Sequence, residues 1–137
     1  VKGTAMSGEL DLAKLMATMS AELHEGVFVF ATVKNGQMPT GVAPRMMFQE
    51  NEGTTLILLK SEAEAAGLSF EFPSRMITLN VHSSLEAVGF IACIATELAA
   101  AGMGVNPVSA FYHDHLFIPD GRQDEAMTLL KAMAASR

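Results

Sequence analysis

Cysteine is almost missing from this chain of 137 residues, because Cys93 is the only one. One thiol cannot form an intramolecular disulfide, and no zinc site can be built from cysteines here. Such sparse use of cysteine is typical of a reducing compartment, so we expect the protein to be cytoplasmic.

Basic residues are also scarce, because nine Lys and Arg stand against fifteen Asp and Glu, for a formal net charge of −6. The nine are scattered singly along the chain and form no basic stripe. Binding to a nucleic-acid backbone takes clustered Lys and Arg, so we expect no nucleic-acid partner.

Long apolar runs are absent as well. The most apolar stretch, residues 87–95, is far shorter than the roughly 20 residues that a bilayer-crossing helix needs. Residues 1–15 include Glu9 and Asp11 and have no long apolar core, so we expect no signal peptide and no membrane partner. Half of the residues are nevertheless apolar and only 18% are charged, which is enough material for a folded core.

The first half of the chain, residues 1–70, predicts the element order α-β-β-β-α. Helical apolar spacing predicts a helix near residues 8–20, with Ser7 as its N-cap and Gly26 as its stop. Glycines and prolines mark residues 35–44 as a surface loop. The remaining elements are strands at 27–33, 45–50 and 54–60, and a short helix that Ser61 and Glu64 cap and Gly67 ends.

The second half, residues 71–137, predicts the order β-α-β-β-α, after a connector at 68–73. Two capping pairs, Ser83 with Glu86 and Asp120 with Gln123, mark the starts of its helices. The strands are expected at 76–82, 105–111 and 116–118, with a tight turn at 112–114, and the helices at 84–101 and from the second pair to about 134.

The related element orders of the two halves indicate a duplicated plan. The predicted fold class is therefore α+β, with two ferredoxin-like units in tandem, antiparallel sheets and helices packed on one face. Each unit has about 65 residues, which is marginal for an isolated core, so the halves are expected to share a sheet or a helix layer.

The predicted helix at 84–101 is nearly all apolar. Its only charged residues, Glu86 and Glu97, fall within about 20° of each other on one narrow stripe. Phe90 and Cys93 lie on or beside that stripe, so Phe90 is expected either to face water or to meet a partner. Packing on the sheet and a subunit interface both remain possible for this helix.

Three sequence runs resemble the ACT domain, a ferredoxin-like fold that senses amino acids and similar metabolites. Residues 77–90 (ITLNVHSSLEAVGF) resemble its strand-turn-helix opening, and residues 105–119 (VNPVSAFYHDHLFIP) look like a signature of small stand-alone bacterial tandem ACT proteins. Residues 48–56 match the same branch, and the resemblance spans 8–134. The first unit lacks its opening strand and the chain ends where the last strand of the second would begin, which favours an exchange of strands between the halves.

The resemblance implies a ligand at the loop between the first strand and first helix of the second unit. A helix N-terminus there offers unpaired N–H groups and a partial positive charge to a carboxylate, and Gly89 permits close approach. Related arginine-sensing proteins use a hairpin aspartate for the α-amino group, and Asp114 matches it. The predicted ligand-binding residues are His82, Ser83, Ser84, Leu85, Val88, Gly89, Asn106 and Asp114.

Each of these residues also has a purely structural interpretation. Ser83 with Glu86 would serve as a helix cap alone, and Asp114 would be a turn residue that bonds its own backbone. Asn106 precedes Pro107, which by itself holds it extended.

The predicted function is a non-enzymatic regulatory module that binds a small molecule, with an amino acid as the expected ligand, and forms a homodimer; no catalytic residue, metal site or cofactor is expected. One alternative is a protein-interaction module without a ligand, suggested by Phe90 and ten methionines. A less favoured alternative is a metal site of His113, His115 and His82.

Overall fold

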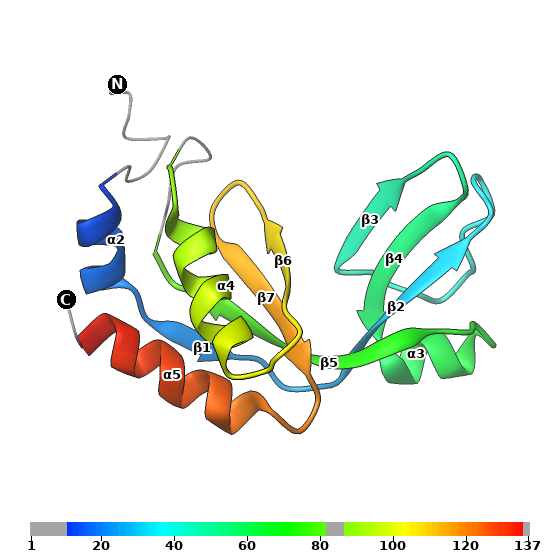
Figure 1. Cartoon of the computed structure of the whole chain (residues 1–137). Helices are drawn as coiled ribbons and strands as arrows, with labels where there is room; N and C mark the ends of the chain where they lie inside the picture. Colours follow the sequence, from blue (N-terminus) through cyan, green and yellow to red (C-terminus); the bar gives the residue numbers. More distant parts are fainter. Residues whose placement is uncertain (1–10, 82–86, 136–137) are drawn as a thin grey trace. The chain divides into compact units, whose positions relative to one another are not determined.

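The structure, a computed structural model, describes residues 11–81 and 87–135 and divides into two compact units. Unit 1 takes residues 1–24 and 76–137 of the chain, and unit 2 takes residues 25–75. Strand β5 (Glu71–Leu79) runs from unit 2 into unit 1, so both units draw on it (Figure 1). The expected boundary between residues 70 and 71 remains a prediction.

Unit 1 has the ferredoxin-like strand order β1–β5–β7–β6. Its elements β5, α4, β6, β7 and α5 follow one another along the chain in the order β-α-β-β-α of a ferredoxin-like unit. The fourth strand of that unit is supplied by β1, which pairs antiparallel with β5 from Ala21 opposite Leu79 to Leu23 opposite Ile77. The bounds are α2 (Leu12–Thr18), β1 (Ala21–Leu23), α4 (Phe90–Ala100), β6 (Asn106–Ser109), β7 (Asp114–Pro119) and α5 (Gln123–Ala135).

The core of unit 1 lies between these strands and the helices α2, α4 and α5. Helical spacing explains which residues enter it, because positions three and four apart share one face of a helix. Phe90, Ile94 and Leu98 do so on α4, and they meet the inward-facing residues of β5 and β7. The other buried members are Leu15, Met16, Met19, Ile77, Leu79, Met103, Leu116, Ile118, Ala126, Leu130 and Met133.

The start of unit 1 differs from the sequence prediction. Helix α2 begins after Asp11, whose carboxylate accepts from the backbone N–H of Ala13 at 3.0 Å. Asp11 is therefore the N-cap; the predicted cap, Ser7, lies outside the described residues. The helix ends at Thr18 instead of continuing to 20, and the three-residue strand β1, which the sequence prediction missed, follows at once.

Unit 2 has the strand order β3–β4–β2–β5. Its elements are β2 (Phe28–Val33), β3 (Met46–Gln49), β4 (Thr54–Leu59) and α3 (Lys60–Ala65), followed by the first part of β5. These bounds confirm the three strands predicted in this half. Val29 pairs with Leu58 and Ala31 with Leu56, and all four pack toward Ala63 of α3 in a small buried cluster.

Two local predictions in unit 2 are wrong. Helix α3 has Leu59 as its N-cap, without a side-chain capping bond, so Ser61 does not cap it. Residues 71–73, expected in a connector, belong to β5. Both errors arise because the ends of β4 and β5 are set by pairing with neighbouring strands, which local sequence patterns do not show.

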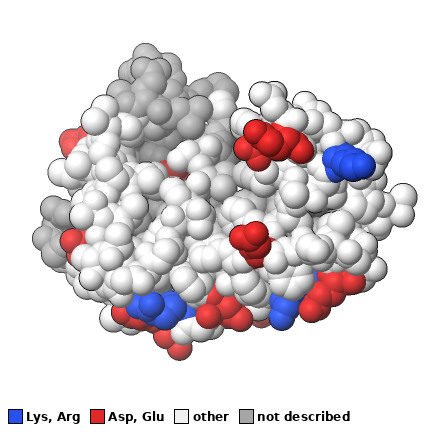
Figure 2. Space-filling model, turned by 45° about the vertical axis from the view of Figure 1, so that its right-hand side comes forward, with Lys and Arg blue, Asp and Glu red and all other residues white. Residues whose placement is uncertain are grey.

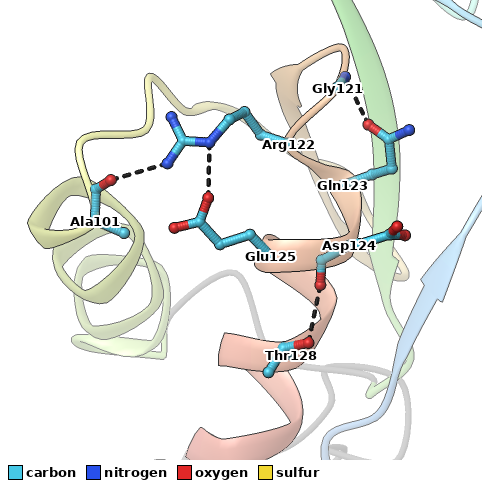
Figure 3. A network of polar contacts seen from close by, with 7 residues as sticks. All are labelled: Ala101, Gly121, Arg122, Gln123, Asp124, Glu125 and Thr128. Atoms are coloured by element: carbon cyan, nitrogen blue, oxygen red, sulfur yellow. Dashed lines mark hydrogen bonds and ion pairs between the residues drawn. The ribbon is translucent and has the colours of Figure 1, made fainter.

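A polar network joins the end of α4 to the start of α5 (Figure 3). Nε of Arg122 donates to Oε1 of Glu125 at 2.7 Å, and Nη2 donates to the carbonyl of Ala101, the C-cap of α4, at 2.9 Å. The hydrogen bond from Arg122 lowers the pKa of Glu125. The Gln123 side chain accepts from the backbone N–H of Gly121. The capping bond predicted between Gln123 and Asp120 is therefore made with Gly121 instead.

Candidate functional site

The predicted ligand-binding residues fall partly outside the described structure. His82, Ser83, Ser84 and Leu85 belong to the segment 82–86, which is not among the described residues. The predicted helix start is nevertheless wrong, because Ala87, Val88 and Gly89 are not helical and α4 begins at Phe90. The site therefore has to be built around the actual first turn of α4.

Gly89 is the N-cap of α4 and adopts a left-handed backbone with φ of 89°. Glycine suits this conformation because a side chain would be strained there. A Cβ at this position would stand 3.6 Å from Leu12, an ordinary contact, so the backbone angle and not space is what calls for glycine. Gly89 has no side chain to cap the helix, and the positive end of the α4 dipole lies just beyond it. The preceding residue, Val88, is 84% exposed.

Asp114 is the first residue of β7 and only 5% exposed, so it is not the turn residue considered from the sequence. Leu116 and Ile118, two and four positions on, both enter the core beneath the helices. Because side chains alternate along a strand, Asp114 points to that same helix-covered face. A buried carboxylate is retained only where polar partners meet it.

The start of β7 lies beside the end of β5. Thr78, the last residue but one of β5, has its hydroxyl 2.8 Å from Nδ1 of His115, next to Asp114. Figure 1 shows the β6–β7 turn and the start of α4 toward one end of unit 1. The fold thus brings Gly89 and Asp114 to the end at which the chain leaves β5.

Asn106 lies away from this end. It opens β6 and pairs with Phe117, whereas Asp114 pairs with Ser109, three positions along the same hairpin. Three residues of strand span about 10 Å. Asn106 is exposed and precedes Pro107, so its position fits the structural interpretation more closely than a ligand contact.

A polar chain that the sequence prediction missed crosses the opposite face of the unit 1 sheet. Nε2 of His24 lies 2.7 Å from the hydroxyl of Thr78, which lies 2.8 Å from Nδ1 of His115. Glu22 stands 4.0 Å from the other ring nitrogen of His24. Thr78 is buried and has one hydroxyl proton, so the two facing ring nitrogens cannot both accept from it and at least one of them is an N–H.

The structure describes most of the residues that suggested the two alternatives. The rings of His113 and His115 lie 6.4 Å apart, and among the described residues no group of three or more His, Cys, Asp or Glu could hold a metal ion; His82 is outside them. Phe90, expected to face water or a partner, is 3% exposed and belongs to the core, so that expectation is wrong. The exposed aromatic residues of this unit are Phe111 and Tyr112, in the β6–β7 turn.

Surface charge and helix length carry less information. Figure 2 shows the Lys and Arg side chains on the face in view as separate patches between acidic ones. Within residues 11–81 and 87–135, no helix has the length and apolar composition that a membrane crossing requires.

Comparisons with known proteins give one family. ACT-domain models match the chain at residues 7–75 and 71–132, and the two matches overlap at the beginning of β5. None of the curated proteins matches the sequence.

Solved structures resemble the chain over most of its length. A Vibrio cholerae protein of unknown function, described as a possible transport protein, is 39% identical with a TM-score of 0.81, over 90% of this chain and 95% of that one. The regulatory subunit of aspartate kinase from Thermus flavus is 10% identical with a TM-score of 0.64, over 83% and 96%. The second likeness shows the fold alone, and it confirms tandem ferredoxin-like units.

Proposed function

The chain belongs to the ACT-domain family, and from that premise we propose that it binds an amino acid at the end of unit 1 where α4 begins. Domains of this family are regulatory ligand-binding modules. We propose in addition that the protein does not convert the ligand chemically. Binding itself, in the cytoplasm, is then the regulatory signal.

The observation that best supports this proposal is that the start of β7, at Asp114, and the start of α4 lie toward the same end of unit 1 (Figure 1). An α-amino acid carries a carboxylate and an ammonium group attached to the same carbon atom. The first turn of α4, with Gly89 as its cap, offers N–H groups and a partial positive charge to a carboxylate. The buried carboxylate of Asp114 offers an acceptor for an ammonium group. The sequence also predicts His82, Ser83, Ser84, Leu85, Val88 and Asn106 as ligand-binding residues; the first four lie outside the described residues, and Asn106 is at the far end of the β6–β7 hairpin.

A thermal-shift panel of the twenty amino acids on the full chain tests the proposal. A ligand that binds only the folded state stabilises it by mass action, by about 2.7 kcal/mol when its concentration is a hundred times the dissociation constant. This added stability raises the melting temperature. We expect one amino acid, or one chemical group of them, to raise it. No shift with any of the twenty at millimolar concentration would overturn the proposal.

Two variants locate the binding. Gly89→Asp places a carboxylate on the first turn of α4 itself, in a residue type that tolerates a left-handed backbone, so it should abolish the response to the ligand. Gly36→Asp is the matched control, because Gly36 has a similar φ of 80° in open surroundings. Asp114→Asn should also abolish the response, with Asp124→Asn on the exposed side of α5 as its control.

We also propose that the protein is a homodimer, because exposed apolar side chains gather near the same end of unit 1. Phe111 and Tyr112 are 53% and 63% exposed, with their rings packed on each other at 5.0 Å. Contiguous exposed apolar surface is a feature of protein–protein interaction sites. Light scattering on Phe111→Asp should give a folded monomer; a dimer of unchanged mass would exclude this surface.

A further inference from the structure

Unit 2 contains a cavity that the proposed amino-acid site does not use. Its volume is about 420 Å³, which is in the range of small-molecule sites. Phe30 and Phe70 provide apolar walls, and Thr32, Thr55 and Ser69 provide hydroxyl groups. Glu71 provides the only charged side chain, and no Lys or Arg is among its described lining residues.

The cavity lies where β5 stops accompanying β2. Strand β2 pairs with β4 along its whole length, but with β5 only at Phe28 and Phe30. Successive residues of β2 turn their backbone groups to opposite sides, and since the carbonyl of Val27 accepts from Lys60 on the β4 side, Ala31 faces β4 as well. The described pairing therefore leaves the backbone of Thr32 without a strand partner on the side away from β4, and Thr32 lines the cavity. A bound molecule can consequently reach backbone groups as well as side chains.

An irregularity in β5 sets the position of Glu71. Phe28 is opposite Ser74, so a regular ladder would put Phe72 opposite Phe30, yet Glu71 occupies that place. The extra residue is accommodated at Phe72, which has a φ of 57°, a left-handed angle that is costly for a bulky residue. The ring of Phe72 still contacts the ring of Phe30, with centroids 5.8 Å apart.

Strained backbone of this kind persists where the surrounding structure holds it, and it gathers at ligand sites. Here its consequence is specific: it places a carboxylate beside the aromatic wall of the cavity. The charge next to the cavity has the same sign, since Thr55 donates its hydroxyl proton to Glu50 at 2.5 Å. An anionic ligand would meet the carboxylate of Glu71, with that of Glu50 behind Thr55, and no Lys or Arg among the described lining residues.

We propose that this cavity binds a small organic cation, a protonated primary amine with an apolar body. The ammonium group pairs with Glu71, and the apolar body lies against Phe30 and Phe70, whose ring faces also attract cations. The site is separate from the amino-acid site of unit 1 and does not depend on it.

Protonated benzylamine and its neutral analogue benzyl alcohol test the charge requirement. Each is titrated into the isotope-labelled full chain, and the backbone NMR signals are followed. We expect benzylamine to shift the signals of Thr32, Ser69 and Glu71 in a saturable way, with benzyl alcohol at least about fivefold weaker. If benzylamine shifts only the signals of Gly89 and Asp114, or shifts none, the cavity is not its binding site. If benzylamine and benzyl alcohol bind equally well, the site does not require a positive charge.

Matched variants test the assigned carboxylate. Glu71→Gln removes the charge from the cavity wall and should weaken benzylamine about fivefold to tenfold. Glu64→Gln removes a charge from α3 that is also exposed but lies outside the cavity, and should leave the affinity within about twofold. Added salt should weaken benzylamine and not benzyl alcohol. Equal affinities of the two variants, or binding that salt does not change, would contradict the proposal.

Discussion

Replacing Thr78 by valine tests the polar chain from His24 to His115. Valine keeps the shape of threonine but has no hydroxyl, so both hydrogen bonds are lost and two ring nitrogens lose a partner. A buried hydrogen bond contributes about 1 kcal/mol net, and an abandoned polar group costs about as much. His24 keeps some access to water, since its side chain is 26% exposed, which limits the penalty.

We therefore expect Thr78→Val to lower the free energy of unfolding by about 1–2 kcal/mol, and the melting temperature by about 3–6 °C. Urea unfolding monitored by circular dichroism measures the change. Thr128→Val is the matched control, because its hydroxyl donates to the carbonyl of Asp124 on the exposed side of α5. Thr78→Ser, which keeps the hydroxyl, should recover part of the loss.

The same reasoning predicts the state of the histidine rings. Long-range ¹H–¹⁵N spectra should show an N–H on at least one of the two nitrogens that face Thr78. Equal costs for Thr78→Val and Thr128→Val, or two bare nitrogens facing the hydroxyl, would refute this description of the chain.

Three further predictions concern stability. Phe90→Ala should cost about 3–5 kcal/mol in urea unfolding because it opens a cavity in the core of unit 1, whereas the exposed Phe111→Ala should cost under about 1 kcal/mol; similar costs would show that Phe90 is not buried. Gly53→Ala should destabilise by about 1–3 kcal/mol, since its Cβ would stand 2.7 Å from the carbonyl oxygen of Val33, and more than Gly36→Ala, which meets nothing within 4 Å. The hydrogen bond from Arg122 holds the pKa of Glu125 below its ordinary value. The pair should therefore stabilise the fold at any pH above the ordinary pKa and lose this effect as the pH falls through the lowered pKa. A double-mutant cycle with Arg122→Gln and Glu125→Gln should show a small coupling energy at neutral pH that vanishes in acid, and a coupling energy that grows in acid would contradict this sign.

The sequence predicted those elements whose signal is local and repeated. Strand β2 is a run of β-branched and aromatic residues that is apolar on both faces, and the hairpin of β3 and β4 surrounds Gly53, so the predicted bounds of all three lie within a residue or two of the structure. The apolar spacing also predicted the helix α4, and the packing on the sheet that the sequence allowed is what Ile94 and Leu98 do. Only Phe90 was placed wrongly, because the polar stripe on which it was expected includes Glu86, a residue that precedes the first residue of α4.

The parts that were missed depend on residues far apart in the chain. Strand β1 has three residues, too few to show a period, and it is a strand because it pairs with β5 more than 50 positions later. Thr78 is 54 positions from His24 and 37 from His115, so no spacing rule could bring them together. For the candidate site, the sequence predicted Gly89 in the first turns of a helix and Asp114 as a ligand residue or a turn residue; the structure has Gly89 as the N-cap of α4 and Asp114 as the first residue of β7, and their role in binding stays a prediction.

The most direct measurement is an NMR titration of the full chain with each of the twenty amino acids, followed at the backbone amides of Phe90 and Ile91, the first residues of α4, and at Asp114. We predict that at least one amino acid shifts all three together and saturably, and that Gly89→Asp removes the shifts while Gly36→Asp keeps them. If no amino acid moves these signals at millimolar concentration, or if the shifts persist unchanged in Gly89→Asp, the end of unit 1 is not the binding site.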